Sequence, residues 1–262
     1  MPATYGRSDD LQGSRFTGAN LRDARFVGTT LRGARIAESD LTGVVMRGVE
    51  VDGLDIDAPW LSEGENPLRV NGVEVGPFVE AELDRRFPGR VERHADDPEG
   101  LRAAWEVLQH AWAAALDRVA AMPPGTVDTS VDGEWSFAQT LRHLVLATDM
   151  WLGKAILRNE QPFHPLGLRD AGTAQDDADS SASSIFSSST PSYSQVLDAR
   201  AGRVAMMRDF LASVTADELA TERHNPHAPE HPETVLSCLH TILEEEWEHL
   251  RFATRDLDSL GA

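Results

Sequence analysis

The strongest constraint on the fold of this chain is a five-residue period near its start. From Asp9 the sequence divides into ten consecutive pentads that end at Ala58, and glycine closes seven of them. A helix has a period of 3.6 residues and a strand a period of two, so neither places an apolar residue every five positions on one face. The period therefore indicates an internal repeat. The third position is apolar in all ten pentads: Leu11, Phe16, Leu21, Phe26, Leu31, Ile36, Leu41, Met46, Val51 and Ile56.

This pattern resembles the pentapeptide-repeat family. The resemblance implies a right-handed quadrilateral β-helix over residues 1–58, in which the third-position side chains stack inside beside small first-position residues. With four repeats to a coil, as in that family, the segment would make about two and a half coils, a short solenoid whose ends need capping.

Some members of that family mimic DNA, so the charge of the segment matters. Residues 1–58 hold seven arginines and nine acidic residues, a net charge of −2, whereas the whole chain carries −19. The acidic charge therefore lies outside the repeats, which is the reverse of what DNA mimicry requires. Nucleic-acid binding is disfavoured as well, because so acidic a chain offers little to replace counterions along a phosphate backbone.

Other features concern the setting of the protein. No apolar run approaches the roughly 18 residues of a membrane span, and the first residues do not read as a signal peptide. The single cysteine, Cys238, cannot form an internal disulfide, so we expect a cytoplasmic protein. Lys154 is the only lysine beside 23 arginines, a bias typical of GC-rich bacterial genomes.

After the repeats we expect a connector over residues 59–97 and an all-α domain over residues 98–262. In the connector, Asn71-Gly72 lies between β-formers and predicts a short hairpin, which would cap the solenoid. Beyond it, apolar residues recur at helical spacing in four segments and predict a four-helix bundle. The segments start at Asp97-Pro98, near Ser136, after Pro191 and after Pro232. A serine-rich stretch at residues 180–190 separates the second and third and is expected to be mobile.

The fourth helix carries the most informative polar residues. Glu244 and Glu248 share one side with Arg251 and Arg255, which predicts a solvated face. Glu245 and His249 lie one above the other on a different, partly apolar flank. On the second helix His143 lies on an apolar strip. A carboxylate and two imidazoles inside a bundle are a suitable set of metal ligands.

Two segments resemble the DinB-like superfamily over roughly residues 98–260. They are Gly133-Glu134-Trp135-Ser136-Phe137 with His143 shortly after, and Glu245-Glu246-Trp247-Glu248-His249. The match is to the branch that contains mycothiol-dependent maleylpyruvate isomerase. The resemblance implies that His143, Glu245 and His249 bind a divalent metal, with zinc favoured over nickel or iron(II).

Simpler interpretations exist for each residue. A Glu-x-x-x-His pair is usually an exposed pair worth a few tenths of a kcal/mol, and a lone histidine such as His143 is usually a core residue. Cys238 is expected to be a small buried hydrophobe. Histidines 224, 227 and 231 are expected in a solvated loop, and the tryptophans 105, 112, 135, 151 and 247 in the core.

The leading functional hypothesis is a thiol-dependent S-transferase or isomerase, with mycothiol as co-substrate and a small electrophile as the second partner. One alternative is a metal-dependent hydrolase with Glu246 or Glu248 as base. The other is a non-catalytic scaffold that docks partners through the repeats. No nucleic-acid or membrane partner is expected, and a homodimer is left open.

Overall fold

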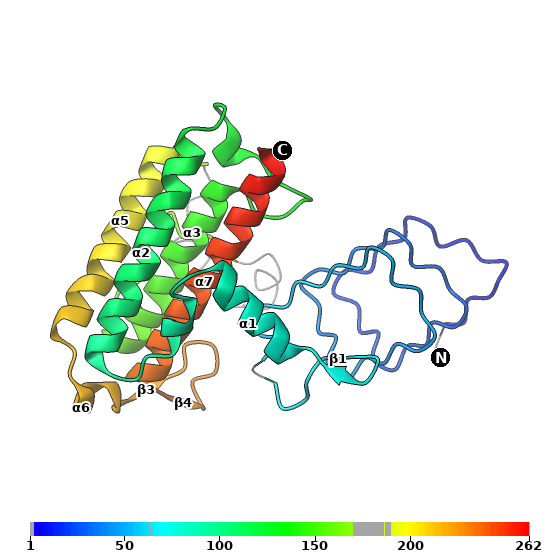
Figure 1. Cartoon of the computed structure of the whole chain (residues 1–262), viewed down its shortest axis with the longest axis horizontal. Helices are drawn as coiled ribbons and strands as arrows, with labels where there is room; N and C mark the ends of the chain where they lie inside the picture. Colours follow the sequence, from blue (N-terminus) through cyan, green and yellow to red (C-terminus); the bar gives the residue numbers. More distant parts are fainter. Residues whose placement is uncertain (1–2, 63, 170–185, 187–189, 262) are drawn as a thin grey trace. The chain divides into compact units, whose positions relative to one another are not determined.

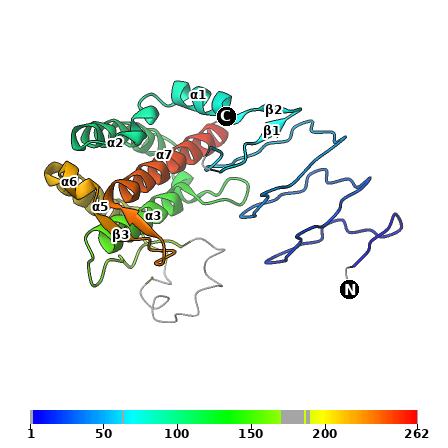
Figure 2. The same ribbon diagram turned by 90° about the horizontal axis from the view of Figure 1, so that it is seen from below.

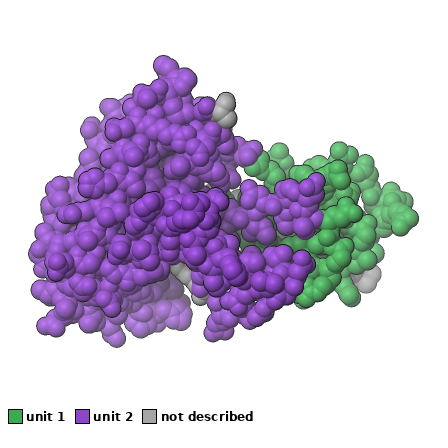
Figure 3. All heavy atoms as spheres, in the orientation of Figure 1, with its two compact units in different colours: residues 1–50 green, residues 51–262 purple. Residues whose placement is uncertain are grey.

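A computed structural model describes residues 3–62, 64–169, 186 and 190–261 of the chain (Figure 1). It divides into two compact units, Met1–Glu50 and Val51–Ala262 (Figure 3). The serine-rich stretch at residues 180–190 lies almost wholly outside the described residues. The division into residues 1–58, 59–97 and 98–262 stays a prediction.

The first unit is a succession of turns. In every second pentad the carbonyl of the third residue accepts a hydrogen bond from the first residue of the next pentad, as between Leu11 and Ser14 at 3.0 Å. The residue before the donor has a left-handed backbone, for example Gly13 with φ 73°. Gly18, in the pentad between, has φ 59°. The glycines that close the pentads therefore occupy positions where a side chain would be unfavourable.

The predicted closed quadrilateral β-helix is not formed by the described residues 3–50. The segment is an open coil (Figure 1, Figure 2), and its third-position side chains are exposed, from 44% at Leu11 to 63% at Ile36. Its backbone hydrogen bonds each span three residues, so none joins one coil to the next. The glycine pattern determines the turns locally, whereas a closed interior requires hydrogen bonding between coils, which the five-residue period does not encode.

The connector contains the predicted hairpin and a helix that was not predicted. Strands β1 (Arg69–Val70) and β2 (Val73–Glu74) pair antiparallel. Asn71 and Gly72 have φ of 51° and 83°, as a type I′ turn requires. Helix α1 (Gly76–Arg86) and the 3-10 helix η1 (Arg90–His94) follow. The capping role of the hairpin stays a prediction.

The rest of the second unit is mainly helical, and all four predicted helices are present. Asp97 caps α2 by accepting from the backbone N–H groups of Glu99 and Gly100. Ser136 and Ser192 begin α3 and α5 with capping boxes. The elements are α2 (Pro98–Ala120), η2 (Thr126–Asp128), α3 (Phe137–Thr148), the π-helical η3 (Asp149–Ile156), α5 (Tyr193–Ser213), α6 (Ala216–Leu219), β3 (Glu222–His224), β4 (Pro232–Thr234) and α7 (Val235–Leu260).

One hydrophobic core holds this unit together. The long helices α2, α3, α5 and α7 lie side by side in both ribbon views (Figure 1, Figure 2). Leu108, Leu144, Met207 and Leu239, one from each helix, have no exposed surface. Among the described residues, no helix is both long and apolar enough to cross a membrane.

The predicted solvated face of α7 is wrong, because the connector covers it. Arg93 of η1 donates to Glu244 at 2.6 Å, and Arg90 lies 3.4 Å from Glu248. Glu248 is only 4% exposed as a result. Helical phase could not reveal this, since the arginines that neutralise these carboxylates come from residues about 150 positions earlier.

A second buried ion pair joins α5 to α7. Arg200 donates to Glu246 at 2.5 Å, and Glu246 is 1% exposed. Burial raises the pKa of the Glu246 carboxyl above its ordinary value, although Arg200 opposes this effect. The pair therefore buries two ionisable groups that compensate each other inside the core.

We expect Arg200→Ala to lower the free energy of unfolding by about 3–5 kcal/mol, because it leaves Glu246 buried without its counter-charge. Arg208→Ala is the matched control, since Arg208 lies on the same helix, is exposed and pairs within the described part of the chain with its neighbour Asp209. Urea unfolding of both variants measures the effect. Equal stability of the two variants would contradict the claim that the buried Glu246 needs the counter-charge of Arg200.

Candidate metal centre

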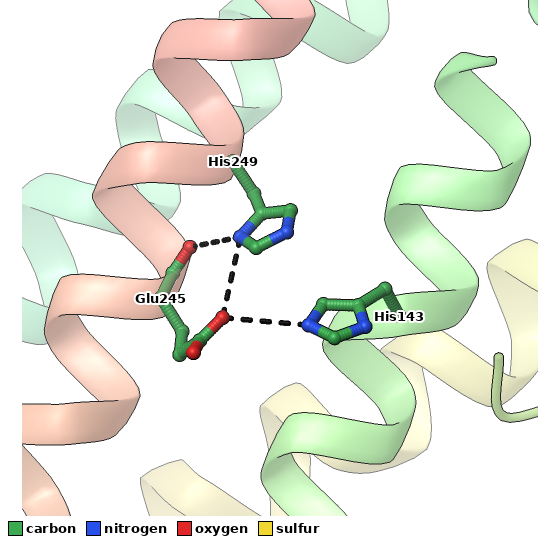
Figure 4. A group of neighbouring side chains, drawn as sticks. All are labelled: His143, Glu245 and His249. Carbon is green, nitrogen blue, oxygen red and sulfur yellow. Dashed lines mark hydrogen bonds and ion pairs between the residues drawn. The ribbon is translucent and has the colours of Figure 1, made fainter. Parts of the chain in front are cut away.

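Three side chains from two helices converge in the interior of the second unit. His143 comes from the middle of α3, and Glu245 and His249 come from successive turns of α7 (Figure 4). One potential ligand atom from each lies within 4.8 Å of the other two. All three side chains are at most 20% exposed. The structure thus brings together the three residues that the sequence singled out.

The carboxylate of Glu245 lies between the two imidazoles. Its Oε2 is 3.4 Å from Nε2 of His143 and 3.4 Å from Nδ1 of His249. The two imidazole rings are nearly parallel, with centroids 4.7 Å apart. These distances are long for hydrogen bonds, which are usually below about 3.2 Å. They match the roughly 3.3–3.5 Å that separates ligand atoms bound to one tetrahedral zinc ion at 2.0–2.2 Å.

Main-chain carbonyl groups orient both imidazoles. Nδ1 of His249 lies 2.7 Å from the carbonyl oxygen of Glu245, one turn earlier on α7. Nδ1 of His143 lies 3.3 Å from the carbonyl oxygen of Leu168. A neutral imidazole that donates from Nδ1 carries its lone pair on Nε2, which for His143 is also the atom that faces Glu245. Such outer hydrogen bonds are typical of metal-binding histidines.

The electrostatics of the site favour an ionised carboxylate. Burial alone would raise the pKa of Glu245, but the polar contact with His143 and the charges of His249, His143 and His227 hold that pKa below its ordinary value. Metal ligands must be deprotonated, so an anionic carboxylate beside two imidazoles suits a divalent cation. The three residues therefore fit a metal by number, donor type and spacing.

Aromatic side chains border the two histidines. The Trp135 ring lies 4.7 Å from that of His143 and 6.1 Å from that of His249. Phe252 meets His249 edge-on at 5.7 Å. The expectation that Trp135 belongs to the core was therefore incomplete: it is only partly buried and lies against the site. The other four tryptophans are in the core, with at most 8% exposed surface.

Other residues considered from the sequence lie elsewhere. Glu246 pairs with Arg200, and Glu248 pairs with Arg90 and Arg251, so each carboxylate is already engaged by arginine. Cys238 is fully buried, and burial raises the pKa of its thiol to about 11. Histidines 224, 227 and 231 are exposed as expected, although the ring of His227 lies 5.7 Å from that of Trp151.

A second Glu-x-x-x-His pair shows what the local spacing alone produces. Glu106 and His110 on α2 have the same four-residue spacing, and Nδ1 of His110 contacts the carbonyl of Glu106 at 2.8 Å. Both side chains are exposed. The histidine contributed by α3 and the burial of the flank therefore distinguish the pair on α7 from an ordinary surface pair.

Comparison with known families agrees with this architecture. Residues 107–253, more than half of the chain, match the DinB superfamily, and residues 10–48 match pentapeptide repeats in eight copies. The match to the superfamily includes all three residues of the candidate metal centre, whereas the last two pentads, 49–58, lie beyond the repeat match. No curated protein and no solved structure matches the chain. This chain therefore belongs to the DinB superfamily and carries a run of pentapeptide repeats before its DinB domain.

Proposed function

We propose that this protein is a metal-dependent enzyme that uses a low-molecular-weight thiol, with mycothiol in first place, for S-transfer or isomerisation of a small electrophile. The site would rest on a four-helix bundle and take zinc, or else nickel or iron(II). The observation that carries the proposal is the convergence of His143, Glu245 and His249, with one potential ligand atom of each within 4.8 Å of the others.

The number of ligands supports a catalytic rather than a structural role. Structural zinc sites are usually closed by four protein ligands, whereas catalytic sites have three and keep a position for a substrate. Among the described residues, three side chains form the candidate group. When bound, the metal lowers the pKa of a coordinated thiol, so that a thiolate nucleophile exists at neutral pH.

The single cysteine supports an external thiol. A protein thiolate would have to be accessible and have a lowered pKa to act as nucleophile. Cys238 has the opposite properties, because it has no exposed surface and its pKa is raised to about 11. The nucleophile in a thiol-dependent reaction would therefore come from a co-substrate.

The remaining residues of the site would orient the ligands and limit the access of water. The carbonyl of Leu168 would hold His143, and the carbonyl of Glu245 would hold His249. Trp135 and Phe252 would cover part of the two imidazole rings and so limit the access of water. Hydrolysis is the runner-up, but its suggested bases Glu246 and Glu248 are both engaged by arginines.

We expect purified wild-type protein to bind about one equivalent of zinc or cobalt(II). His143→Ala, Glu245→Ala and His249→Ala should each weaken binding by at least about tenfold, since each removes a ligand. Equilibrium dialysis with metal analysis measures the change.

The matched controls are Glu106→Ala and His110→Ala, which remove the same residue types at the same spacing from an exposed part of α2. They should bind metal like the wild type. Two results would favour a non-catalytic scaffold. One is an equal loss of metal binding in the ligand variants and the control variants, and the other is a wild-type protein that binds no metal under any condition.

We also expect the cobalt(II) form to bind mycothiol directly through sulfur. An open position on the ion predicts an intense sulfur-to-cobalt charge-transfer band in the near ultraviolet when the thiol is added. The same compound with its sulfur methylated is the control and should give no band. A metal-loaded protein that gives no band with mycothiol or other small cellular thiols would favour hydrolysis.

A further inference from the structure

Arg255 lies at the centre of a polar network on the second turn of α7 after His249. Its Nη1 donates to Asp57 at 2.8 Å, its Nη2 to Glu134 at 2.5 Å and its Nε to Asp256 at 2.8 Å. One guanidinium group thus joins the end of the tenth pentad, the loop before α3 and α7 itself. The planar fork of arginine suits this role, because it presents several donors in fixed directions.

The same guanidinium contacts one of the aromatic residues that border the site, Phe252, and binds the residue that precedes the other, Trp135. Glu134, which it binds, immediately precedes Trp135 in the chain. The ring of Phe252 lies 5.4 Å from the Arg255 guanidinium carbon and 4.4 Å from that of Arg251. These are cation–π distances. Trp135 and Phe252 in turn contact the imidazoles of His143 and His249.

Asp57 connects the two arginines. Its Oδ1 accepts from Arg251 at 2.5 Å and its Oδ2 from Arg255 at 2.8 Å. Arg251 is held in addition by Glu248 at 2.7 Å. The carboxylate of Asp57 therefore fixes both cations that flank Phe252. This aspartate lies in the last pentad, which belongs to the same compact unit as the helices.

The network affects position more than stability. The side chains of Asp57, Arg255 and Glu134 are 31%, 34% and 51% exposed. Ion pairs at such exposure usually contribute little to the free energy of folding. Their directional contacts nevertheless hold Phe252 and the residue before Trp135. The rings of Trp135 and Phe252 lie against the candidate metal ligands His143 and His249.

We propose that Arg255 is a positioning residue of the metal centre. Through Glu134 and through the ring of Phe252 it holds the aromatic border against His143 and His249, and Asp57 keeps it in place. The tenth pentad is therefore part of the metal-binding unit rather than a spacer. This inference rests on the proposed metal binding at His143, Glu245 and His249.

The test measures cobalt(II) affinity and the visible spectrum of the bound cobalt in the full chain. Arg255→Ala should weaken cobalt binding by about tenfold to a hundredfold, the range typical of residues that orient metal ligands. It should also change the ligand-field bands, which report coordination geometry. Asp57→Asn should change both in the same direction but less, because Arg255 keeps its contacts with Glu134 and Asp256.

Arg118→Ala is the matched control. Arg118 also forms an ion pair with α7, to Asp258 at 2.6 Å, at comparable exposure, and no contact of Arg118 with the aromatic border is seen in the described residues. It should leave affinity and spectrum unchanged. If Arg255→Ala fails to fold, Arg255→Lys, which keeps the charge but loses the fork, should show the same spectral change.

The outcomes distinguish a failure of the positioning role of Arg255 from a failure of the proposed metal binding. A wild-type protein that binds cobalt, with Arg255 and Asp57 variants that match it in affinity and spectrum, would overturn the positioning role and leave the metal centre intact. A wild-type protein that binds no cobalt would overturn the proposed function itself. Equal changes in the Arg118 and Arg255 variants would reduce Arg255 to a general anchor of α7.

Discussion

The arrangement of the helical unit depends on the neutralisation of buried charge along one stretch of α7. Four carboxylates occur within five residues there, and successive side chains of a helix point about 100° apart. These carboxylates therefore face different parts of the unit, except for Glu244 and Glu248, which are four residues apart and share one side. Each must meet a partner, because a buried unpaired charge is strongly unfavourable. The pairs are Glu244 with Arg93, Glu245 with His143, Glu246 with Arg200, and Glu248 with Arg90 and Arg251.

This pattern explains why the candidate ligands are so well placed. Partners on η1 and α5 fix the rotation of α7 about its axis, which leaves Glu245 and His249 facing α3. His143 lies opposite them at contact distance. The connector is then a structural part of the helical unit, since Arg90 and Arg93 of η1 are buried against α7. A metal ion would bind beside Glu245, whose carboxylate meets imidazoles, whereas the carboxylates of Glu244, Glu246 and Glu248 meet guanidinium groups.

Much of the helical unit could be predicted from the sequence, because its signals are local. The helix starts at Asp97-Pro98 and after Pro191, and the Asn71-Gly72 turn, depend on neighbouring residues and were predicted correctly. The candidate site followed from helical phase together with family resemblance. The burial of Glu248 could not be predicted, because its partner Arg90 lies 158 residues away. The open coil of the repeats was missed for a related reason, since the five-residue period describes single turns and not the contact between coils.

Binding of one metal ion by His143, Glu245 and His249 can be measured directly. X-ray absorption spectroscopy at the zinc edge of the zinc-loaded protein, without added thiol, tests it most directly. We expect nitrogen and oxygen neighbours at about 2.0–2.2 Å and the outer-shell scattering of two imidazoles. Sulfur at about 2.3 Å would place the metal at Cys238 instead and contradict the account. A spectrum without imidazole scattering would contradict it equally.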